Sequence, residues 1–161
     1  MADLIADFED GRTGWRVITD QVMGGVSSGR FEIRREGAQA FLELTGTVST
    51  ANNGGFIQAR YDLPDTWPAG ARALRLRVRG DGQVYYIHLK LHGAQRPWHY
   101  YQASFDAGPD WREIVLPLAA FVPSREGLPR HFAPETVVSL AVVAYGRDHE
   151  AHVAVSRIEV E

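Results

Sequence analysis

Polar residues that could do chemistry gather in two glycine-rich segments, residues 20–29 and 51–56. Within the first, residues 25–29 match the G-x-S-x-G pattern that presents a nucleophilic serine in hydrolases. That pattern requires a strand before the serine and a helix after it. Residues 30–34 instead alternate in polarity, which is typical of a strand, so we expect Ser27 to lie in a turn without a catalytic role.

His88 and His92 are the strongest candidates for metal ligands, because their spacing would place both imidazoles on one face of a helix. The residues around them alternate in polarity, however, and predict a strand, on which four residues span roughly 13 Å. Zinc requires its ligands about 2 Å from a single ion. We therefore expect no metal site and no cofactor, and contact between His92 and His99 across a turn is the alternative that stays open.

The remaining polar loop residues form a candidate binding surface. Adjacent glycines permit positive φ and close backbone approach, so both segments can form tight turns, and we expect positive φ at Gly25 and Gly54. Asp and Asn beside glycine often bond their own turn, which is the structural alternative for much of this set. The candidate surface comprises Asp20, Met23, Gly24, Gly25, Ser27, Asn52, Asn53, Gly54, Gly55, Arg60, Asp81 and Tyr101.

Aromatic residues are a further binding candidate, because sugars and extended peptides stack on exposed rings. The group consists of Tyr85, Tyr86, Trp98, Tyr100 and Tyr101. Neighbouring residues of a strand face opposite sides of the sheet, so about half of these rings are expected to belong to the core.

The segments that must position these groups alternate with the two-residue period of half-buried strands. Predicted strands include residues 31–33, 42–48, 74–79, 85–91, 114–118 and 138–142. Residues 153–160 change parity, which predicts a final strand with a bulge near Ser156 or Arg157. Residues 133–136 are the one short helical segment expected. Turn signals occur at residues 80–82, 93–97, 107–110 and 123–129.

Many short strands with regular turns predict an all-β fold, a β-sandwich of two antiparallel sheets with very little helix. No linker or repeat divides the 161 residues, so one domain, residues 1–161, is expected.

Composition argues against several classes of partner and site. The net charge is −3 without a basic block, so nucleic acid is not expected, although Arg75, Arg77 and Arg79 share one parity. The chain has no cysteine, which excludes disulfides and thiolate metal sites. It shows neither a secretion signal nor an apolar membrane span, so we expect a cytoplasmic protein.

Residues 15–27 and 46–56, together with Arg60, resemble the complex I intermediate-associated protein 30 family. Later segments around residues 79–85, 101–105 and 111–123 follow the family in the same order. The resemblance implies a galactose-binding-like jelly-roll β-sandwich without an established catalytic site. Mitochondrial members act as assembly factors for the membrane arm of respiratory NADH:ubiquinone oxidoreductase.

From this resemblance we expect a non-enzymatic protein-binding module, related to assembly factors and chaperones, whose partners include respiratory-complex subunits. The alternative is a carbohydrate-binding β-sandwich module that holds a sugar or another small ligand, with a structural calcium ion. Enzymatic activity and RNA binding rank below both hypotheses.

Overall fold

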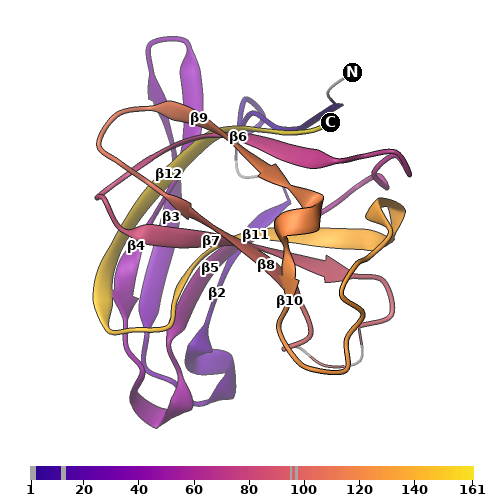
Figure 1. Ribbon diagram of the computed structural model, residues 1–161. Helices are drawn as coiled ribbons and strands as arrows, with labels where there is room; N and C mark the ends of the chain where they lie inside the picture. The colour runs from indigo at the N-terminus through magenta and orange to yellow at the C-terminus, as the bar shows by residue number, and fades with distance from the viewer. Residues whose placement is uncertain (1–2, 12–13, 95, 97) are drawn as a thin grey trace.

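The computed structural model describes residues 3–11, 14–94, 96 and 98–161 (Figure 1). Gln95 and Pro97, which belong to a turn predicted from the sequence, lie outside the described residues, as do Met1, Ala2, Arg12 and Thr13.

Two antiparallel sheets pack face to face, which confirms the predicted β-sandwich (Figure 1). The first sheet has the strand order β3-β4-β12-β6-β9, and β1 pairs with β12 beside this path. Its strands are β1 (Asp3–Ala6), β3 (Ser28–Glu36), β4 (Gln39–Val48), β6 (Ala73–Gly80), β9 (Arg112–Pro117) and β12 (His149–Val160).

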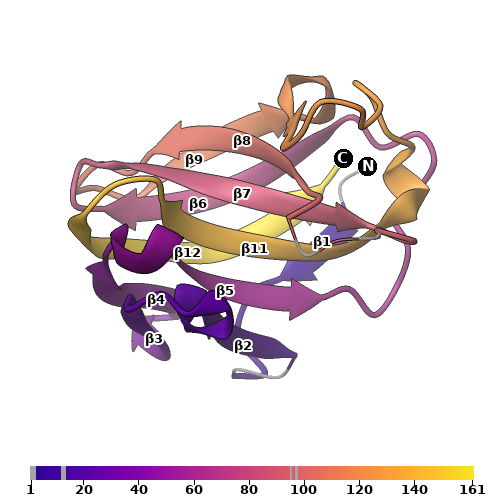
Figure 2. The same ribbon diagram turned by 90° about the horizontal axis from the view of Figure 1, so that it is seen from below.

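The second sheet has the order β10-β8-β7-β11-β5-β2, and Figure 2 shows most of its outer face. Its strands are β2 (Trp15–Thr19), β5 (Phe56–Asp62), β7 (Val84–Leu91), β8 (Tyr101–Asp106), β10 (Val122–Pro123) and β11 (Val137–Tyr145). Short 3₁₀ helices connect some strands: η1 (Asp20–Met23), η2 (Ala51–Asn53), η3 (Leu118–Ala120) and η4 (Pro134–Thr136).

The alternating aliphatic residues fill the space between the sheets. Leu42, Leu76 and Val155 of the first sheet and Ile87 and Leu140 of the second are almost completely buried. Burial of each such side chain contributes about 1.5–3 kcal/mol relative to exposure, so the alternation fixes which face of each strand turns inward. The opposite parity of β5, β7 and β11 is thereby left on the outer face of the second sheet.

The strands expected from strong alternation are confirmed, as is the bulge in β12, where the register against β6 shifts between Val155 and Arg157. The helical segment near residue 134 is the single turn η4. Alternation did not predict β1, β2, β5, β8 and β10. In β5 and β8 the inward positions include Ala59 and Ala103, whose small side chains weaken the apolar period. Among the described residues, no helix is long and apolar enough to cross a membrane.

Candidate functional site

The Asp20 carboxylate ties the two glycine-rich segments together. Its side chain is fully buried, with 0% exposure. Oδ1 accepts a hydrogen bond from the Ser27 amide at 2.9 Å, and Oδ2 accepts from the Ser27 hydroxyl at 2.5 Å. Oδ2 also accepts from the amides of Gly55 at 2.5 Å and Phe56 at 3.3 Å. We call Asp20, Gly25, Ser27, Gly54 and Gly55 the Asp20 junction.

These hydrogen bonds keep Asp20 ionised. Burial raises the pKa of its carboxyl group, but the hydrogen bonds from Ser27, Gly55 and Phe56 together lower it by more. The net result is a pKa below the usual value. Within the described part of the chain, no ion pair joins a cation to Asp20. A buried carboxylate satisfied by backbone and hydroxyl donors is a structural device, because its oxygens are already occupied.

Gly25 and Gly54 are required by this carboxylate and not by their backbone angles. A Cβ on Gly25 would lie 2.4 Å from Asp20 Cγ, and one on Gly54 would lie 2.4 Å from Asp20 Oδ2. The expectation of positive φ at these two positions is wrong. Positive φ occurs at their neighbours, 89° at Gly24 and 128° at Gly55.

Other members of the predicted surface lie around the junction. Asn52 and Asn53 have φ of 58° and 60°, the left-handed conformation that Asn tolerates, and the Asn52 side-chain amide donates to the Gly24 carbonyl at 3.3 Å. Ser27 is buried, and its hydroxyl accepts from the Ser49 amide at 2.9 Å. β3 begins directly after Ser27, as expected from the alternation, so the helix of a nucleophile elbow is missing there.

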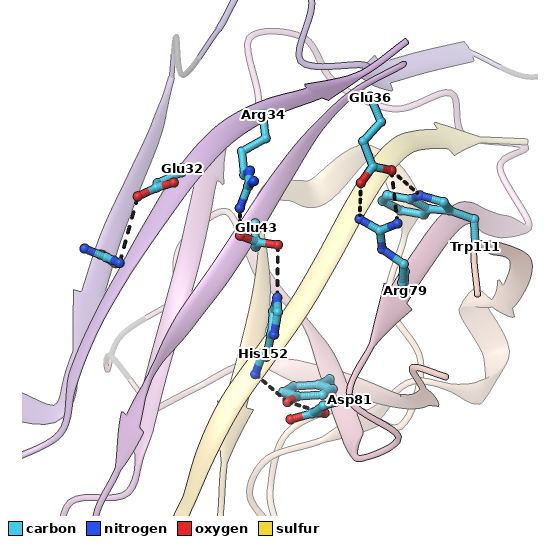
Figure 3. Close-up of polar contacts among 10 residues, drawn as sticks. Glu32, Arg34, Glu36, Glu43, Arg79, Asp81, Trp111 and His152 are labelled. Atoms are coloured by element: carbon cyan, nitrogen blue, oxygen red, sulfur yellow. Dashed lines mark hydrogen bonds and ion pairs between the residues drawn. The ribbon is translucent and has the colours of Figure 1, made fainter. Parts of the chain in front are cut away.

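Asp81 and Tyr101 do not join the junction. Asp81 lies in the turn between β6 and β7, where Oδ1 accepts from the Tyr85 hydroxyl at 2.9 Å (Figure 3). Tyr101 is only 2% exposed, and its hydroxyl donates to the Pro129 carbonyl at 2.5 Å. The burial of Tyr101 follows from the alternation of β8, because Tyr101 occupies an inward position of that strand.

The arginines that share one parity of β6 are occupied by neighbouring side chains. Arg79 donates to both carboxylate oxygens of Glu36 at 3.0 and 2.9 Å, and its guanidinium lies 4.5 Å from the Trp111 ring centroid (Figure 3). Arg75 is paired with Glu113 at 2.7 Å and with Glu161 at 2.8 Å. The outer face of the first sheet is therefore a network of paired charges.

The outer face of the second sheet contains a cleft of about 500 Å³. Its floor is the central strand β11, where Ser139 and Ala141 turn short side chains outward. In register, Ala141 lies between Arg60 of β5 and His88 of β7, while Ser139 pairs with Lys90. Small residues on the middle strand and long ones on both flanking strands produce a groove along β11.

The rims of the cleft are apolar and exposed. Val22 and Met23 of η1 are 76% and 59% exposed, and Trp98 is 47% exposed; all three line the cleft. Asn53 and Gly54 line it on the side of η2, which lies beside η1 near one end of β5 (Figure 2). The Asp20 junction therefore holds in place the loops that form one wall of the cleft.

Aromatic rings line the part of the cleft beside β7 and β11. The His88 ring stacks on Tyr100, with centroids 4.0 Å apart and planes at 14°, and Tyr145 meets His88 edge-on at 5.4 Å. Gln102 Oε1 accepts from the Tyr145 hydroxyl at 2.6 Å and lies 3.1 Å from His88 Nε2. Because that oxygen can only accept, this arrangement assigns the imidazole proton to Nε2.

His88 is neutral at physiological pH, because burial lowers its pKa to about 3. Among the described residues, no group of three or more His, Asp or Glu side chains is arranged to hold a metal ion. The cleft thus offers hydrogen-bonding, apolar and cationic groups, and its shape suits the binding of a ligand.

Comparison with known protein families finds the family that the two glycine-rich segments resemble. Residues 6–151 match the complex I intermediate-associated protein 30 family. The chain belongs to this family. No curated protein sequence matches the chain.

Solved structures similar to this family member establish the fold as a galactose-binding-like jelly-roll β-sandwich. A family 11 carbohydrate-binding module from Clostridium thermocellum, in complex with a β-1,3-1,4-mixed-linked tetrasaccharide, aligns with a TM-score of 0.79 and 16% identity, covering 99% of this chain and 94% of that one. A family 30 carbohydrate-binding module has a TM-score of 0.61 and 15% identity, over 85% and 91% of the two chains. An exo-β-agarase aligns over 98% of this chain but 25% of its own, with a TM-score of 0.67 and 10% identity.

Several residues of the cleft in this family member were not predicted from the sequence, among them Lys90, Arg125 and Tyr145. The alternation of β7 contained part of the signal, because placing Ile87 and Leu89 inward puts His88 and Lys90 outward. Which residues lie beside them on β5 and β11 depends on strand register, which the sequence does not reveal.

Proposed function

We propose that this protein is a non-catalytic protein-binding module that holds a segment of a partner protein in the cleft of the second sheet. The observation that carries the proposal is the exposed apolar rim, formed by Val22, Met23 and Trp98 around a preformed groove. Clustered exposed apolar side chains beside a groove are typical of protein interaction sites. The cleft volume of about 500 Å³ lies within the range of about 300–1,000 Å³ that is typical of ligand-binding clefts.

The junction and the rim have separate roles in this proposal. Buried Asp20 and Ser27 hold the two loops in place, and the exposed residues of η1 contact the partner. The family to which the chain belongs supports a role in assembly of a larger complex, with subunits of respiratory complex I as the first partners to test. We place this activity in the cytoplasm.

The test is site-specific photo-cross-linking in native cells. A benzoylphenylalanine at Met23 is expected to capture a distinct partner, and Trp98→Ala is expected to reduce that adduct several-fold. The matched control carries the same cross-linker at Val115 of β9, which is 46% exposed on the other sheet. Identical adducts from both positions, or none from Met23, would refute the proposal. Subunits of respiratory complex I among the adducts would support the assembly role.

Carbohydrate binding is the second candidate, favoured by the aromatic lining of the cleft and Trp98 at its rim. One contact weighs against it: His88 and Tyr100 stack on each other and so cover ring faces that a sugar would need. A glycan array probed with the intact protein, together with a thermal shift assay in calcium, separates this candidate from the first. Binding to a defined glycan that Trp98→Ala abolishes would favour the sugar.

A further inference from the structure

The described residues of the cleft carry more positive charge than their neighbours balance. Arg60, Lys90 and Arg125 line it, and no aspartate or glutamate of the described residues does. The neighbouring carboxylate, Asp62, is shared: Oδ2 lies 2.6 Å from Arg16 Nη1, and Oδ1 lies 3.7 Å from Arg60 Nε. One carboxylate therefore serves two guanidinium groups, and no carboxylate of the described residues is paired with Lys90.

Lys90 is the single lysine of the chain. Within the described residues its ammonium group has neither a hydrogen bond nor an ion pair. Burial lowers its pKa, and the positive charges of Arg60 and Arg16 lower it further. Lys90 is thus a partly desolvated cation without a paired carboxylate among the described residues, and such groups are common in binding sites.

Arg60 shows the same imbalance. Its Nε is buried and donates no hydrogen bond in the described part of the chain, and burial lowers the pKa of its guanidinium. A buried donor without an acceptor is costly unless a bound group completes it. Arg60 and Lys90 flank the short side chains of Ala141 and Ser139, so both cations reach the same groove.

The positive surface extends beyond the cleft. An adjoining hollow of about 480 Å³ shares Arg60 and Lys90 with it and is also lined by His92 and Arg96. Described aspartates and glutamates do not line this hollow either. The chain as a whole has a net charge of −3, so the positive groove is a local feature and not a result of overall composition.

We propose that the segment bound in the cleft is acidic, and that one of its carboxylates lies between Arg60 and Lys90. The inference rests on the proposed function and names the chemistry of its partner. Cationic side chains on the groove and apolar side chains at the rim fit a peptide with an aspartate, glutamate or C-terminal carboxylate beside an apolar residue. Such a carboxylate would supply the acceptor that Arg60 and Lys90 lack.

A random decapeptide display library is the first probe, with the intact protein as bait. Enriched peptides are then treated with a carbodiimide, which activates a peptide carboxylate; the Lys90 amine displaces the activating group as a urea and forms an amide. Because the chain has one lysine, a cross-link at Lys90 places the carboxylate directly. Of the protein's amines, only the N-terminal one competes for the peptide carboxylate. The amines of the peptide are acetylated beforehand so that they cannot couple to carboxylates of the protein, and mass spectrometry separates the two products.

Two variants separate charge from reactivity. Lys90→Arg keeps the charge and is expected to bind within about 3-fold of the wild type but to lose the cross-link, whereas Lys90→Gln is expected to weaken binding at least 10-fold. Melting temperatures verify that both variants fold. A peptide with its acidic residue replaced by the amide is expected to lose affinity for the wild type and to show little further loss with Lys90→Gln.

The outcomes distinguish the two proposals. Acidic peptides that cross-link at Lys90 support the inference. Enriched peptides without acidic residues, bound equally by Lys90→Gln, would overturn the acidic-ligand inference and leave protein binding intact. If no peptide is enriched, protein binding itself fails and the inference with it. In that case, retention of polygalacturonate by the wild type but not by Lys90→Gln would assign the cations to an acidic sugar.

Discussion

Replacement of Asp20 by asparagine tests the central structural claim, because it changes charge and one acceptor while preserving shape. The Ser27 amide can still donate to the retained oxygen at Oδ1. The new amide group would face the Gly55 amide, which donates to Oδ2 at 2.5 Å in the wild type, so two donors would meet. The Ser27 hydroxyl has an alternative acceptor in the Ser49 carbonyl at 3.2 Å.

The expected loss follows from these contacts. The buried Gly55 amide loses its acceptor, at about 1–3 kcal/mol; the longer bond from the Phe56 amide to the same oxygen is lost with it, and the remaining bonds lose their charged partner, which together are worth roughly another 1 kcal/mol. We expect Asp20→Asn to lower the free energy of unfolding by about 2–4 kcal/mol. For a domain of this size each 1 kcal/mol shifts the melting temperature by about 2–4 °C, so a decrease of roughly 4–16 °C is expected.

Urea denaturation at pH 7 measures this loss, with Asp110→Asn as the control. Asp110 is exposed, and its substitution is expected to change the stability by less than about 0.5 kcal/mol. Because the folded pKa of Asp20 lies below 3.8, the unfolded state binds more protons as the pH falls. The stability from Asp20 is therefore present above pH 3.8 and is lost as the pH falls through the folded pKa. Equal stability of the two Asn variants at pH 7 would refute this account of the junction.

Four further predictions concern the loops and the cleft. Gly54→Ala is expected to lower the free energy of unfolding by about 1–3 kcal/mol in the wild type but by much less in an Asp20→Ala background, because its Cβ would lie 2.4 Å from Asp20 Oδ2 and 2.8 Å from Asp20 Cγ, and both atoms are absent from alanine; additive losses in a double-mutant cycle would contradict this. Gly24→Ala, at positive φ in open space, is expected to cost about 1 kcal/mol in both backgrounds by urea denaturation. Burial lowers the pKa of His88 in the folded protein to about 3, below the usual histidine value of 6.5, so the unfolded state binds more protons between these values and the stability from this group rises with pH there. An NMR titration that finds His88 protonated at pH 6 would contradict its burial. Lys90→Met is expected to keep or raise the melting temperature at pH 7, since the wild-type charge is desolvated and repelled by Arg60; a clear decrease in calorimetry would show a structural role for the ammonium.

The local sequence pattern predicted that these loops form tight turns, but it did not predict why glycine is needed at particular positions in them. Paired glycines next to Asp20 indicated tight polar turns, and the turns exist. Positions 25 and 54 require glycine because the Asp20 side chain packs against both and leaves no room for a Cβ. That constraint joins residues distant in sequence, so conformational preference alone assigned positive φ to the wrong member of each glycine pair.

Alternation in the sequence sets which side of most strands is buried, because a period of two leaves only one way to remove the aliphatic face from water. The sequence also determined the β-sandwich and, through its two glycine-rich segments, the family resemblance. Which residues line the cleft depends on the tertiary structure. Strand order and register placed β11, with Ser139 and Ala141 outward, between Arg60 and Lys90. Pairing between strands far apart in the chain is set by packing of the whole sandwich, and no local period records it.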